Sequence, residues 1–250
     1  MRFQGQVVIV TGAARGIGAA IARAFAGEGA RLALLDVDAP ALDTLAKELT
    51  AGDREAVAFR CDVTTPQDVR DTVDAVVTRW GRIDVLVNNA GGFSVIRRTE
   101  EIPEDEWDAI FRFNVTSMFL CVKAVLPLMK RQRAGRIVNM SSVAGRAGAV
   151  TVASHYAAAK AAVLGFTRHL AREVAAEGIT VNAVAPGTVA TERWKALRSP
   201  EESRRLADGV PMRRVSEPAE IAQCVLFLAS EAAAYMTGAT LDVNGGLVMM

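Results

Sequence analysis

The sequence predicts an α/β fold in which one open, doubly wound sheet of seven parallel strands is covered by helices on both faces. Short apolar runs rich in β-branched residues alternate with longer stretches of helical periodicity. A glycine-rich stretch, Thr11 to Gly18, directly follows the first apolar run. The alternation continues without a linker, so we expect a single domain spanning residues 1–250.

Each strand is assigned to a short apolar run, and each helix to the longer periodic stretch that follows it. The expected strands are Val7–Val10, Leu32–Asp36, Ala56–Cys61, Ile83–Asn88, Arg136–Met140, Ile179–Ala183 and Thr240–Val243. The expected helices are Ile17–Glu28, Ala41–Leu49, Pro66–Trp80, Pro103 to about Arg131, about His155 to Glu177, and Pro218–Ala229.

A (β/α)8 barrel is the competing architecture. It requires an eighth strand, which this sequence does not offer, and its phosphate loop usually comes late in the chain rather than after the first strand. The open sheet is therefore preferred. The least regular segment, about 187–218, contains Pro200, Pro211 and many charges, and we expect it to be an insertion able to close over a site.

Composition argues against several classes of function. The formal net charge is +1 with both signs interspersed, so neither nucleic acid nor a membrane is expected as a partner. No apolar run reaches the ~18 residues of a membrane span, and the chain enters its first strand without room for a signal peptide. Cys61, Cys121 and Cys224 form no C-x-x-C pair and the histidines number two, so no metal site is expected. A reducing, cytoplasmic setting fits best.

The stretch TGAARGIG stands between a predicted strand and a predicted helix, the setting in which such a motif binds phosphate. One glycine permits a tight turn, another lets the backbone approach a pyrophosphate, and a third lets the helix pack closely on the sheet. The helix N-terminus then offers unpaired N–H groups to the phosphates. The alternative is a loop that is merely rich in glycine. The spacing G-x-x-x-G-x-G is one residue longer than the usual dinucleotide fingerprint.

Two aspartates follow the next two strands. Asp36 lies 18 residues beyond Gly18, close to the spacing expected of a carboxylate that holds an adenosine ribose. An ordinary strand-end aspartate is the alternative. Asp62 is placed to meet the adenine ring, or equally to cap the helix that starts at Pro66.

A second signal is SHYAAAKAAV, in which Tyr156 and Lys160 are spaced i and i+4 and share one face of a helix. A tyrosine with a pKa near 10 is a poor acid–base catalyst at neutral pH. We expect the ammonium of Lys160 to lower the pKa of Tyr156 towards the working range. Ser141 and Ser142 end a strand at the carboxyl edge, where open α/β sheets bind ligands. A surface Tyr/Lys pair and a simple serine turn are the alternatives.

Taken in order, the glycine loop, Asp36, the serine pair and Y-x-x-x-K resemble the classical subtype of the short-chain dehydrogenase/reductase family, and the resemblance covers the entire chain. It also rests on N-N-A-G at 88–91, on the helix asparagine Asn114 and on P-G at 186–187. The resemblance implies a Rossmann-type fold and hydride transfer between nicotinamide and a secondary alcohol or ketone. Because the serine–tyrosine gap is one residue longer than in many relatives, Ser141 remains an alternative to Ser142.

The resemblance implies a role for each matching residue. Tyr156 would donate a proton to a carbonyl or accept one from an alcohol, Ser142 would orient that oxygen, and Lys160 would hold the nicotinamide ribose. Asn114 would anchor a water in the proton relay. The implied cofactor contacts are Gly12, Arg15, Gly16, Ile17, Gly18, Asp36, Asp62, Val63, Asn88, Ala90, Gly91, Tyr156, Lys160, Pro186, Gly187, Val189 and Thr191.

NAD is expected in preference to NADP. Asp36 would accept hydrogen bonds from the ribose hydroxyls, whereas beside a 2′-phosphate its charge would cost up to ~4 kcal/mol at an effective dielectric near 20. Arg15 could reach such a phosphate, but Val37 offers no compensating charge. An NADP-dependent 3-oxoacyl-thioester reductase is the rival enzyme, and a nucleotide-sensing protein without catalysis is the rival from another class.

Substrate specificity is expected in 92–98, 143–155 and 187–215. The candidates for an apolar wall are Phe93, Val150, Val152, His155 and Trp194. Arg97 and Arg98 would meet an anionic substrate or form a solvated face. The family suggests a homotetramer, and the small residues of AAAKAAVLGF and the apolar end LVMM agree with buried interfaces.

Overall fold

The chain folds around one sheet of seven parallel strands in the order β3-β2-β1-β4-β5-β6-β7. The computed structural model describes residues 1–50, 55–93, 95–148, 152–196 and 199–249. The strands are β1 (Val7–Thr11), β2 (Arg31–Asp36), β3 (Ala56–Arg60), β4 (Val85–Asn88), β5 (Gly135–Met140), β6 (Ile179–Pro186) and β7 (Thr240–Val243). The order reverses at β1 and β4, so the doubly wound sheet is confirmed and the barrel is wrong.

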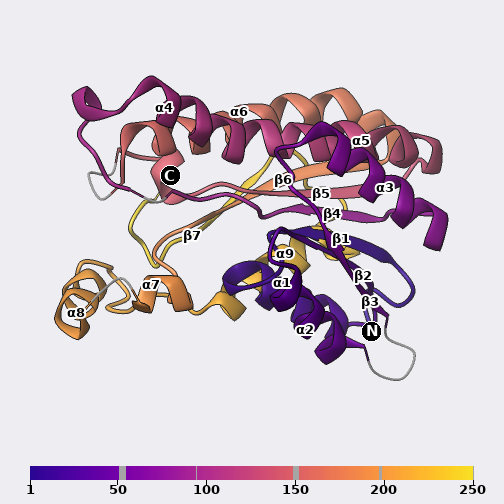
Figure 1. Cartoon of the computed structure of the whole chain (residues 1–250), viewed down its shortest axis with the longest axis horizontal. Coiled ribbons are helices and arrows are strands. Elements are labelled where there is room, and N and C mark those ends of the chain that lie inside the picture. The colour runs from indigo at the N-terminus through magenta and orange to yellow at the C-terminus, as the bar shows by residue number, and fades with distance from the viewer. Residues whose placement is uncertain (51–54, 94, 149–151, 197–198, 250) are drawn as a thin grey trace.

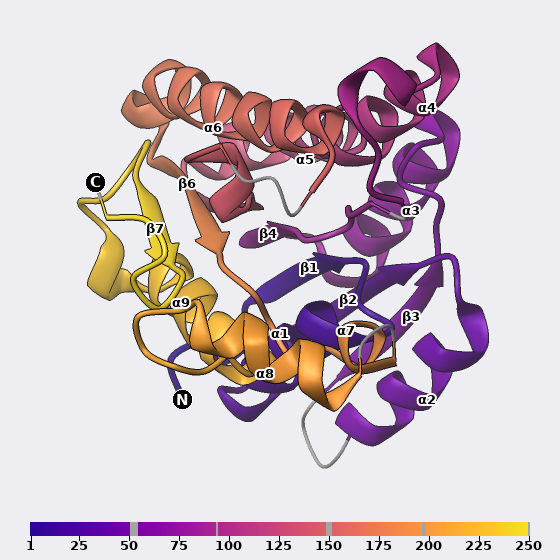
Figure 2. The ribbon, with the colours of Figure 1, turned by 90° about the vertical axis from the view of Figure 1, so that its left-hand side faces the viewer.

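Helices cover both faces of this sheet (Figures 1 and 2). On one face lie α1 (Gly16–Gly27), α2 (Ala39–Leu49) and α9 (Pro218–Ala229). The other face carries α3 (Pro66–Trp80), α5 (Ser117–Gln132) and α6 (Ser154–Val174), with α4 (Glu104–Phe111) beside α6. Short 3-10 turns occupy Thr99–Glu101, Val143–Gly145, Ala175–Glu177 and Glu231–Ala233.

The central strands are uniformly apolar because both of their faces are buried. In β1, Val8 and Val10 point into the core beneath α1 and α9, while Val7 and Ile9 point into the core beneath α3 and α5. Successive side chains of a strand alternate between its faces, so a sheet with two helical layers requires an unbroken apolar run. This requirement explains why short apolar runs predicted the strands.

The long helix expected from Pro103 to about Arg131 is interrupted. It consists of α4, a π-helical turn over Arg112–Thr116, and α5. Single π turns are rare and occur often at functional sites. This one carries Asn114, which is buried at 2% exposure.

The whole run Glu104–Gln132 is long and apolar enough to cross a membrane by length and composition alone. Val122, Val125 and Met129 of this run are buried in the core against the sheet. Of the most apolar window of this run, 39% is buried, and the run lies along the helical layer on one face of the sheet (Figure 1).

The segment expected to be irregular contains two short helices, α7 (Glu192–Ala196) and α8 (Pro200–Asp208). Ser199 and Glu202 form a capping box at the start of α8. Two backbone hydrogen bonds join the beginning of this segment to its end. The Ala190 N–H donates to the Ser216 carbonyl at 2.8 Å, and the Ser216 N–H donates to the Thr188 carbonyl at 3.1 Å. The segment follows directly on the carboxyl end of β6 (Figure 2).

Candidate active site

The loop between β1 and α1 brings the backbone of three glycines to the carboxyl end of the sheet. Gly12 and Gly16 have φ angles of +62° and +56°, in the left-handed region that favours glycine. A Cβ atom on Gly18 would lie 2.0 Å from the carbonyl oxygen of Gly12. Each glycine therefore meets a steric requirement, and the interpretation of a merely glycine-rich loop does not account for the geometry.

The N-terminus of α1 is open to a ligand. Within the described part of the chain, no side chain caps this end, and the first turn contains no acidic residue. The N–H groups of that turn thus present partial positive charge beside the glycine loop. This arrangement fits the diphosphate of a dinucleotide.

Hydrogen bonds brace the glycine loop against the end of β4. Thr11 Oγ1 accepts the N–H groups of Asn89 and Ala90, each at 3.0 Å. Asn89 Nδ2 donates to the carbonyl oxygens of Thr11 and Gly12, at 2.9 and 3.0 Å. Asn89 was absent from the predicted site residues, although its position in N-N-A-G directly after a strand could have revealed it.

Asn88, one residue earlier, points into the protein. Its Nδ2 donates to Asn139 Oδ1 at 2.8 Å, and Asn139 Nδ2 donates to Thr167 Oγ1 at 2.9 Å. Asn88 Oδ1 is buried and has no hydrogen-bond partner among the described residues. A buried acceptor of this kind at the ligand edge of the sheet fits a bound polar group.

Two carboxylates, one in the last residue of β2 and one just beyond it, shape the expected ribose end. Asp36 accepts the N–H of Ala14 through Oδ2 and the N–H of Asp38 through Oδ1, both at 3.1 Å. The guanidinium of Arg15 forms an ion pair with Asp38. Arg15 is therefore engaged by a second carboxylate beside Asp36.

Asp62 shapes the turn before α3. Its Oδ1 accepts the N–H and the hydroxyl of Thr64, at 2.9 and 2.7 Å. The N-cap of α3 is Thr65, so a cap by Asp62 is wrong. Val63, in the same turn, is buried.

The segment after β6 approaches the glycine loop from the far end of the sequence. β6 ends at Pro186, and a Cβ on Gly187 would lie 2.9 Å from Asn244 Cα. A Cβ on Gly16 would lie 3.4 Å from Thr191 Cγ2, so these two expected cofactor residues are neighbours. Thr191 Oγ1 also accepts the N–H of Trp194 at 3.1 Å. Val189 is buried.

Tyr156 and Lys160 lie one turn apart on α6, with Lys160 Nζ 5.7 Å from the centre of the tyrosine ring. The expectation that Lys160 lowers the pKa of Tyr156 is wrong for this structure. Burial raises the pKa of Tyr156 to about 12, against a smaller opposing effect of its hydrogen bond with Ser142. Burial also lowers the pKa of Lys160 to about 8. At neutral pH the tyrosine therefore carries its proton, as a donor to a carbonyl must.

The two serines have different environments. Ser141 Oγ donates to the carbonyl oxygen of Lys160 at 2.8 Å and is buried. Ser142 Oγ accepts the N–H of Ala144 at 3.2 Å and pairs with the Tyr156 hydroxyl. The geometry thus favours Ser142 as the serine of the site.

Lys160 and Asn114 meet at the loop that follows β4. Lys160 Nζ donates to the Met140 carbonyl at 2.9 Å. Asn114 Oδ1 accepts the Gly92 N–H at 2.8 Å, and Asn114 Nδ2 donates to the Gly92 carbonyl at 2.9 Å. A Cβ on Gly91 would lie 2.7 Å from Asn114 Oδ1 and 3.1 Å from Lys160 Nζ, so glycine permits this approach.

The expected apolar wall is reproduced in part. The ring of Phe93 lies 4.7 Å from that of Tyr156, centre to centre. His155 is wrong as a wall residue, because it is fully buried and bound to Glu106 at 3.0 Å. Val152 and Trp194 are half-buried, and Val150 lies outside the described residues.

The expected arginine pair is divided. Arg97 Nε donates to Glu106 Oε2 at 2.8 Å, which engages it within the protein. Arg98 lies on the surface, 3.7 Å from Glu100. The two neighbouring arginines therefore do not form one anion site in this structure.

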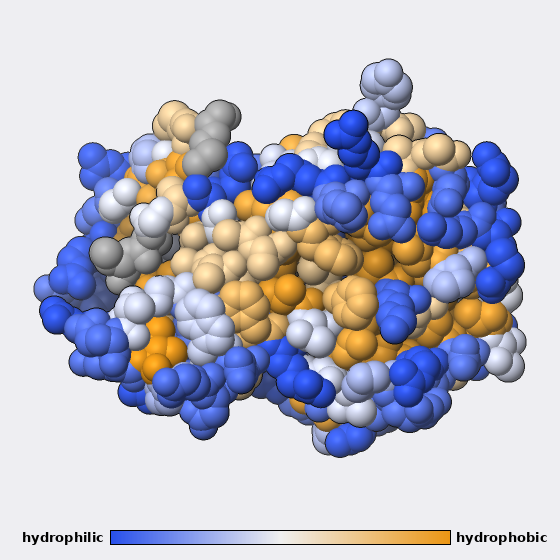
Figure 3. Space-filling model, turned by 90° about the horizontal axis from the view of Figure 1, so that it is seen from above, coloured by the Kyte–Doolittle hydropathy of each residue, from blue (hydrophilic) through white to orange (hydrophobic). Residues whose placement is uncertain are grey.

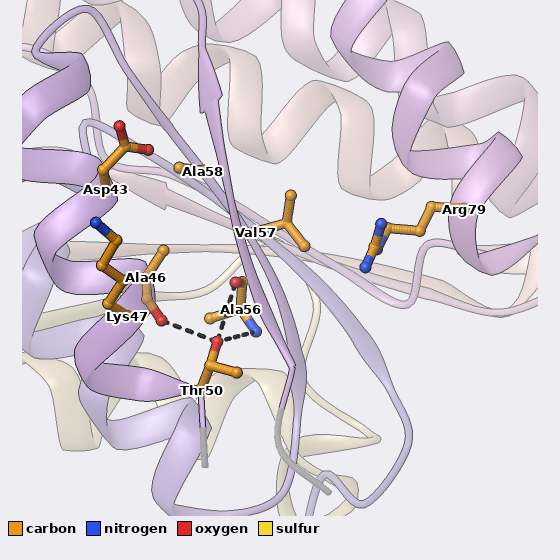
Figure 4. Close-up of a pocket in the computed structure, with 8 residues that line it drawn as sticks. All are labelled: Asp43, Ala46, Lys47, Thr50, Ala56, Val57, Ala58 and Arg79. Carbon is orange, nitrogen blue, oxygen red and sulfur yellow. Dashed lines mark hydrogen bonds between the residues drawn. The ribbon is translucent and has the colours of Figure 1, made fainter. Parts of the chain in front are cut away.

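A hollow of about 530 Å³ lies away from these residues, between α2 and β3 at the edge of the sheet (Figure 4). The Thr50 hydroxyl in it donates to the carbonyl oxygens of Ala46 and Ala56, at 2.9 and 3.2 Å. No cluster of three or more metal-binding side chains occurs in the described part of the chain. The reactive side chains thus gather at the carboxyl edge of β1, β4, β5 and β6.

Comparison with known proteins identifies the family. The model of a family described as enoyl-(acyl carrier protein) reductase matches residues 12–248. A 3-oxoacyl-(acyl-carrier-protein) reductase of Vibrio cholerae is 44% identical over 260 residues, covering all of both chains. The chain belongs to the short-chain dehydrogenase/reductase family. The resemblance seen in the sequence is confirmed, and the protein is an oxidoreductase of this family.

Other family members agree. The 3-oxoacyl-(acyl-carrier-protein) reductase of Escherichia coli is 40% identical over 253 residues and matches the full length of both chains. A crystal structure of such a reductase from Brucella melitensis superposes with a TM-score of 0.92 at 39% identity, covering 100% of this chain and 95% of that one. A second Brucella melitensis structure, with bound NAD, gives a TM-score of 0.90 at 39% identity over the same shares. The Rossmann-type fold of the family is thus confirmed.

Proposed function

We propose that this protein is an NAD(H)-dependent oxidoreductase that interconverts a ketone and a secondary alcohol, with a 3-oxoacyl thioester as its ketone. The observation that carries the proposal is the convergence of Ser142, Tyr156 and Lys160 at the edge reached by the glycine loop. The similarity to 3-oxoacyl-(acyl-carrier-protein) reductases supports the thioester as substrate.

In the proposed reaction, a bound nicotinamide supplies or accepts the hydride. The Ser142 hydroxyl holds the substrate oxygen next to the Tyr156 hydroxyl, which donates its proton to that oxygen during reduction. Lys160 Nζ holds the nicotinamide ribose and carries positive charge beside the developing tyrosinate. Asn114 anchors a water through which Tyr156 regains the proton that it has donated.

The dinucleotide would lie across the glycine loop. Its diphosphate would meet the N–H groups of Gly16, Ile17 and Gly18, while Gly12 leaves room for it. At the adenosine end we assign Arg15, Asp36, Asp62 and Val63, and at the nicotinamide end Asn88, Ala90, Gly91, Pro186, Gly187, Val189 and Thr191.

The preference for NAD over NADP rests on charge. A 2′-phosphate at this position would face Asp36 and Asp38, and Arg15 is held by Asp38. Like charges a few Å apart cost up to about 4 kcal/mol at an effective dielectric near 20. We therefore expect kcat/KM with NADH to exceed that with NADPH by at least about tenfold, which corresponds to ~1.4 kcal/mol.

Two variants sharpen the cofactor experiment. Asp36→Asn removes the ribose acceptor charge, so KM for NADH rises while KM for NADPH falls. Asp38→Asn frees Arg15, so KM for NADPH falls while KM for NADH stays near its original value. A wild-type preference for NADPH would contradict the proposal.

The substrate experiment uses acetoacetyl thioesters beside simple ketones and secondary alcohols, followed at the absorbance of the reduced nicotinamide. We expect the thioester to have the largest kcat/KM. If the protein turned over simple ketones only, the thioester would be wrong as the proposed substrate, and another ketone would take its place. Tight NADH binding without turnover of any member would instead favour a nucleotide sensor.

We also propose a cytoplasmic homotetramer. Trp107, Phe113 and Phe119 are exposed on the layer formed by α4, the π turn and α5, and Figure 3 shows an apolar band across this side bordered by hydrophilic residues. Leu247 and Met249 are exposed near the C-terminus. Light scattering should give about four times the chain mass of 26.6 kDa, and a monomer would contradict the tetramer.

A further inference from the structure

The helix that carries Tyr156 begins without an ordinary cap. A helix N-terminus leaves its first N–H groups unpaired, and a Ser, Thr, Asp or Asn at the N-cap normally accepts one of them. The N-cap of α6 is Ala153, whose side chain has no acceptor. The Tyr156 N–H donates to His155 Nδ1 at 2.8 Å and also to the Ala153 carbonyl oxygen at 3.2 Å, so the imidazole is the closer of two acceptors.

His155 is fixed at both ring nitrogens. It is fully buried, and its Nε2 lies 3.0 Å from Glu106 Oε1 on α4. Because Nδ1 accepts the Tyr156 N–H, the proton of the neutral imidazole must be on Nε2, where it is donated to Glu106. The carboxylate therefore selects the tautomer that allows Nδ1 to accept.

Glu106 joins this pair to the loop after β4. Its second oxygen, Oε2, accepts Arg97 Nε at 2.8 Å. The hydrogen bonds from Arg97 and then His155 hold the pKa of Glu106 below its ordinary value. A second bond, from Thr99 Oγ1 to Ser154 Oγ at 3.1 Å, joins the same loop to the start of α6.

We propose that His155 is a positioning residue for catalysis: its Nδ1 caps the N–H of Tyr156, and Glu106 maintains the tautomer that makes this possible. The proposal rests on the proposed catalytic role of Tyr156. The Tyr156 backbone is thereby held where its hydroxyl meets Ser142, and Phe93 packs on the ring from the loop that Arg97 anchors.

Two substitutions separate the two nitrogens of His155. In His155→Asn, the amide oxygen stands at the distance of Nδ1 and can accept the Tyr156 N–H, while the contact with Glu106 is lost. In His155→Gln, the amide nitrogen reaches Glu106, while the Tyr156 N–H loses the 2.8 Å acceptor Nδ1 and keeps the Ala153 carbonyl oxygen at 3.2 Å. We expect His155→Asn to keep kcat within about threefold, and His155→Gln to lose about tenfold or more, an increase in barrier of ~1.4 kcal/mol.

The dissociation constant of NADH, measured by fluorescence, should stay unchanged in both variants. A merely structural role predicts that Asn and Gln lower kcat alike, in proportion to the folded fraction measured by circular dichroism. Equal kcat in the two variants would overturn the proposal.

The role of Glu106 is tested by comparing its removal with the removal of a control carboxylate. Glu48, on α2, also pairs with an arginine, Arg23, at 2.7 Å, and lies apart from the site. We expect Glu106→Ala to lower kcat severalfold and Glu48→Ala to leave it unchanged. Unchanged kcat in Glu106→Ala would overturn the tautomer argument.

A measurement that requires no turnover distinguishes failure of this proposal from failure of the proposed function. The chain has two tyrosines, Tyr156 and the fully exposed Tyr235. With tyrosine labelled by 13C at Cζ, His155→Gln should shift the Tyr156 resonance while Tyr235 serves as an internal reference. If wild-type protein turns over no substrate, the proposed function fails. An unmoved Tyr156 resonance in His155→Gln overturns the positioning role independently of turnover.

Discussion

The two halves of the candidate active site are shaped by different parts of the chain, one by backbone atoms and the other by buried side chains. On the side of β1 and α1, the geometry comes from backbone: Gly12 and Gly16 have left-handed φ, and Gly18 allows contact with a carbonyl that a Cβ would prevent. On the side of α6, it comes from buried side chains, of which Lys160 is 4% exposed and His155 is fully buried.

This difference teaches where each half is vulnerable. A backbone surface fails when an atom is added, because nothing in it can rotate away. A surface of buried polar side chains fails when a partner is removed, because the remaining group loses its hydrogen bond. We therefore expect opposite kinds of substitution to damage the two halves.

The largest effect is expected on the side-chain half, from Tyr156→Phe. Removal of the hydroxyl deletes the proposed proton donor and leaves the ring in contact with Phe93. Turnover should fall by about 10²–10⁴-fold, the usual contribution of a general acid. The NADH dissociation constant, from fluorescence titration, should change by less than about threefold. Substantial residual turnover would assign the proton transfer to another group.

On the backbone half, the strongest effect is expected from Gly18→Ala. The added methyl would lie 2.0 Å from the Gly12 carbonyl oxygen, so the loop must move. We expect the free energy of unfolding to fall by about 3 kcal/mol and NADH binding to weaken more than tenfold. Gly27→Ala is the matched control in the same helix, because a Cβ there meets no atom within 4 Å. The control should gain up to about 1 kcal/mol in urea denaturation, and equal losses in both variants would refute the steric argument.

Lys160→Met should separate stability from activity. The folded pKa of Lys160, about 8, lies below its ordinary 10.5, so burial of the ammonium opposes folding at lower pH. Between pH 8 and 10.5 the unfolded chain binds more protons, so wild-type stability rises with pH relative to the variant. We expect Lys160→Met to be more stable by about 3 kcal/mol below pH 8, with the gap closing towards pH 10.5.

Activity of Lys160→Met should be largely lost. Urea denaturation at several pH values, set beside turnover, checks both statements. A variant that is less stable than the wild type at pH 7 would show that the hydrogen bond to Met140 outweighs the burial of charge.

The smallest effect lies outside both halves, at Arg213. This exposed arginine has φ of +54°, the left-handed conformation that glycine adopts at no steric cost. Arg213→Gly should raise the free energy of unfolding by about 0.5–1 kcal/mol and leave kcat unchanged. Arg214→Gly is the control, since it loses the ion pair with Glu220 and relieves no left-handed residue, and thermal denaturation should rank it below the wild type.

The fold was predictable because its main determinants are local and periodic. Apolar runs such as Val7–Val10 and the glycine loop reveal strands and a phosphate turn without knowledge of their neighbours. Tyr156 and Lys160 were found for a similar reason, since a helix places i and i+4 together. The cofactor preference and the site roles remain predictions that the proposed experiments test.

What the sequence did not reveal depends on burial or on distant contacts. The pKa of Tyr156 follows from loss of water around its hydroxyl, which no spacing rule contains. Asn89 and the Glu106–His155 pair act through partners far along the chain. The π turn at Arg112–Thr116 lies in a run whose composition suits an ordinary helix.

That π turn sets the rotation of α5 about the helix axis relative to α4. Each residue advances an α-helix by about 100°, so one extra residue in a turn rotates the following helix by that angle relative to the preceding one. α4 can thus direct Glu106 at His155 while α5 directs Val122 and Val125 at the sheet. Deleting a single residue there would make the helix regular, and one of these two alignments would be lost.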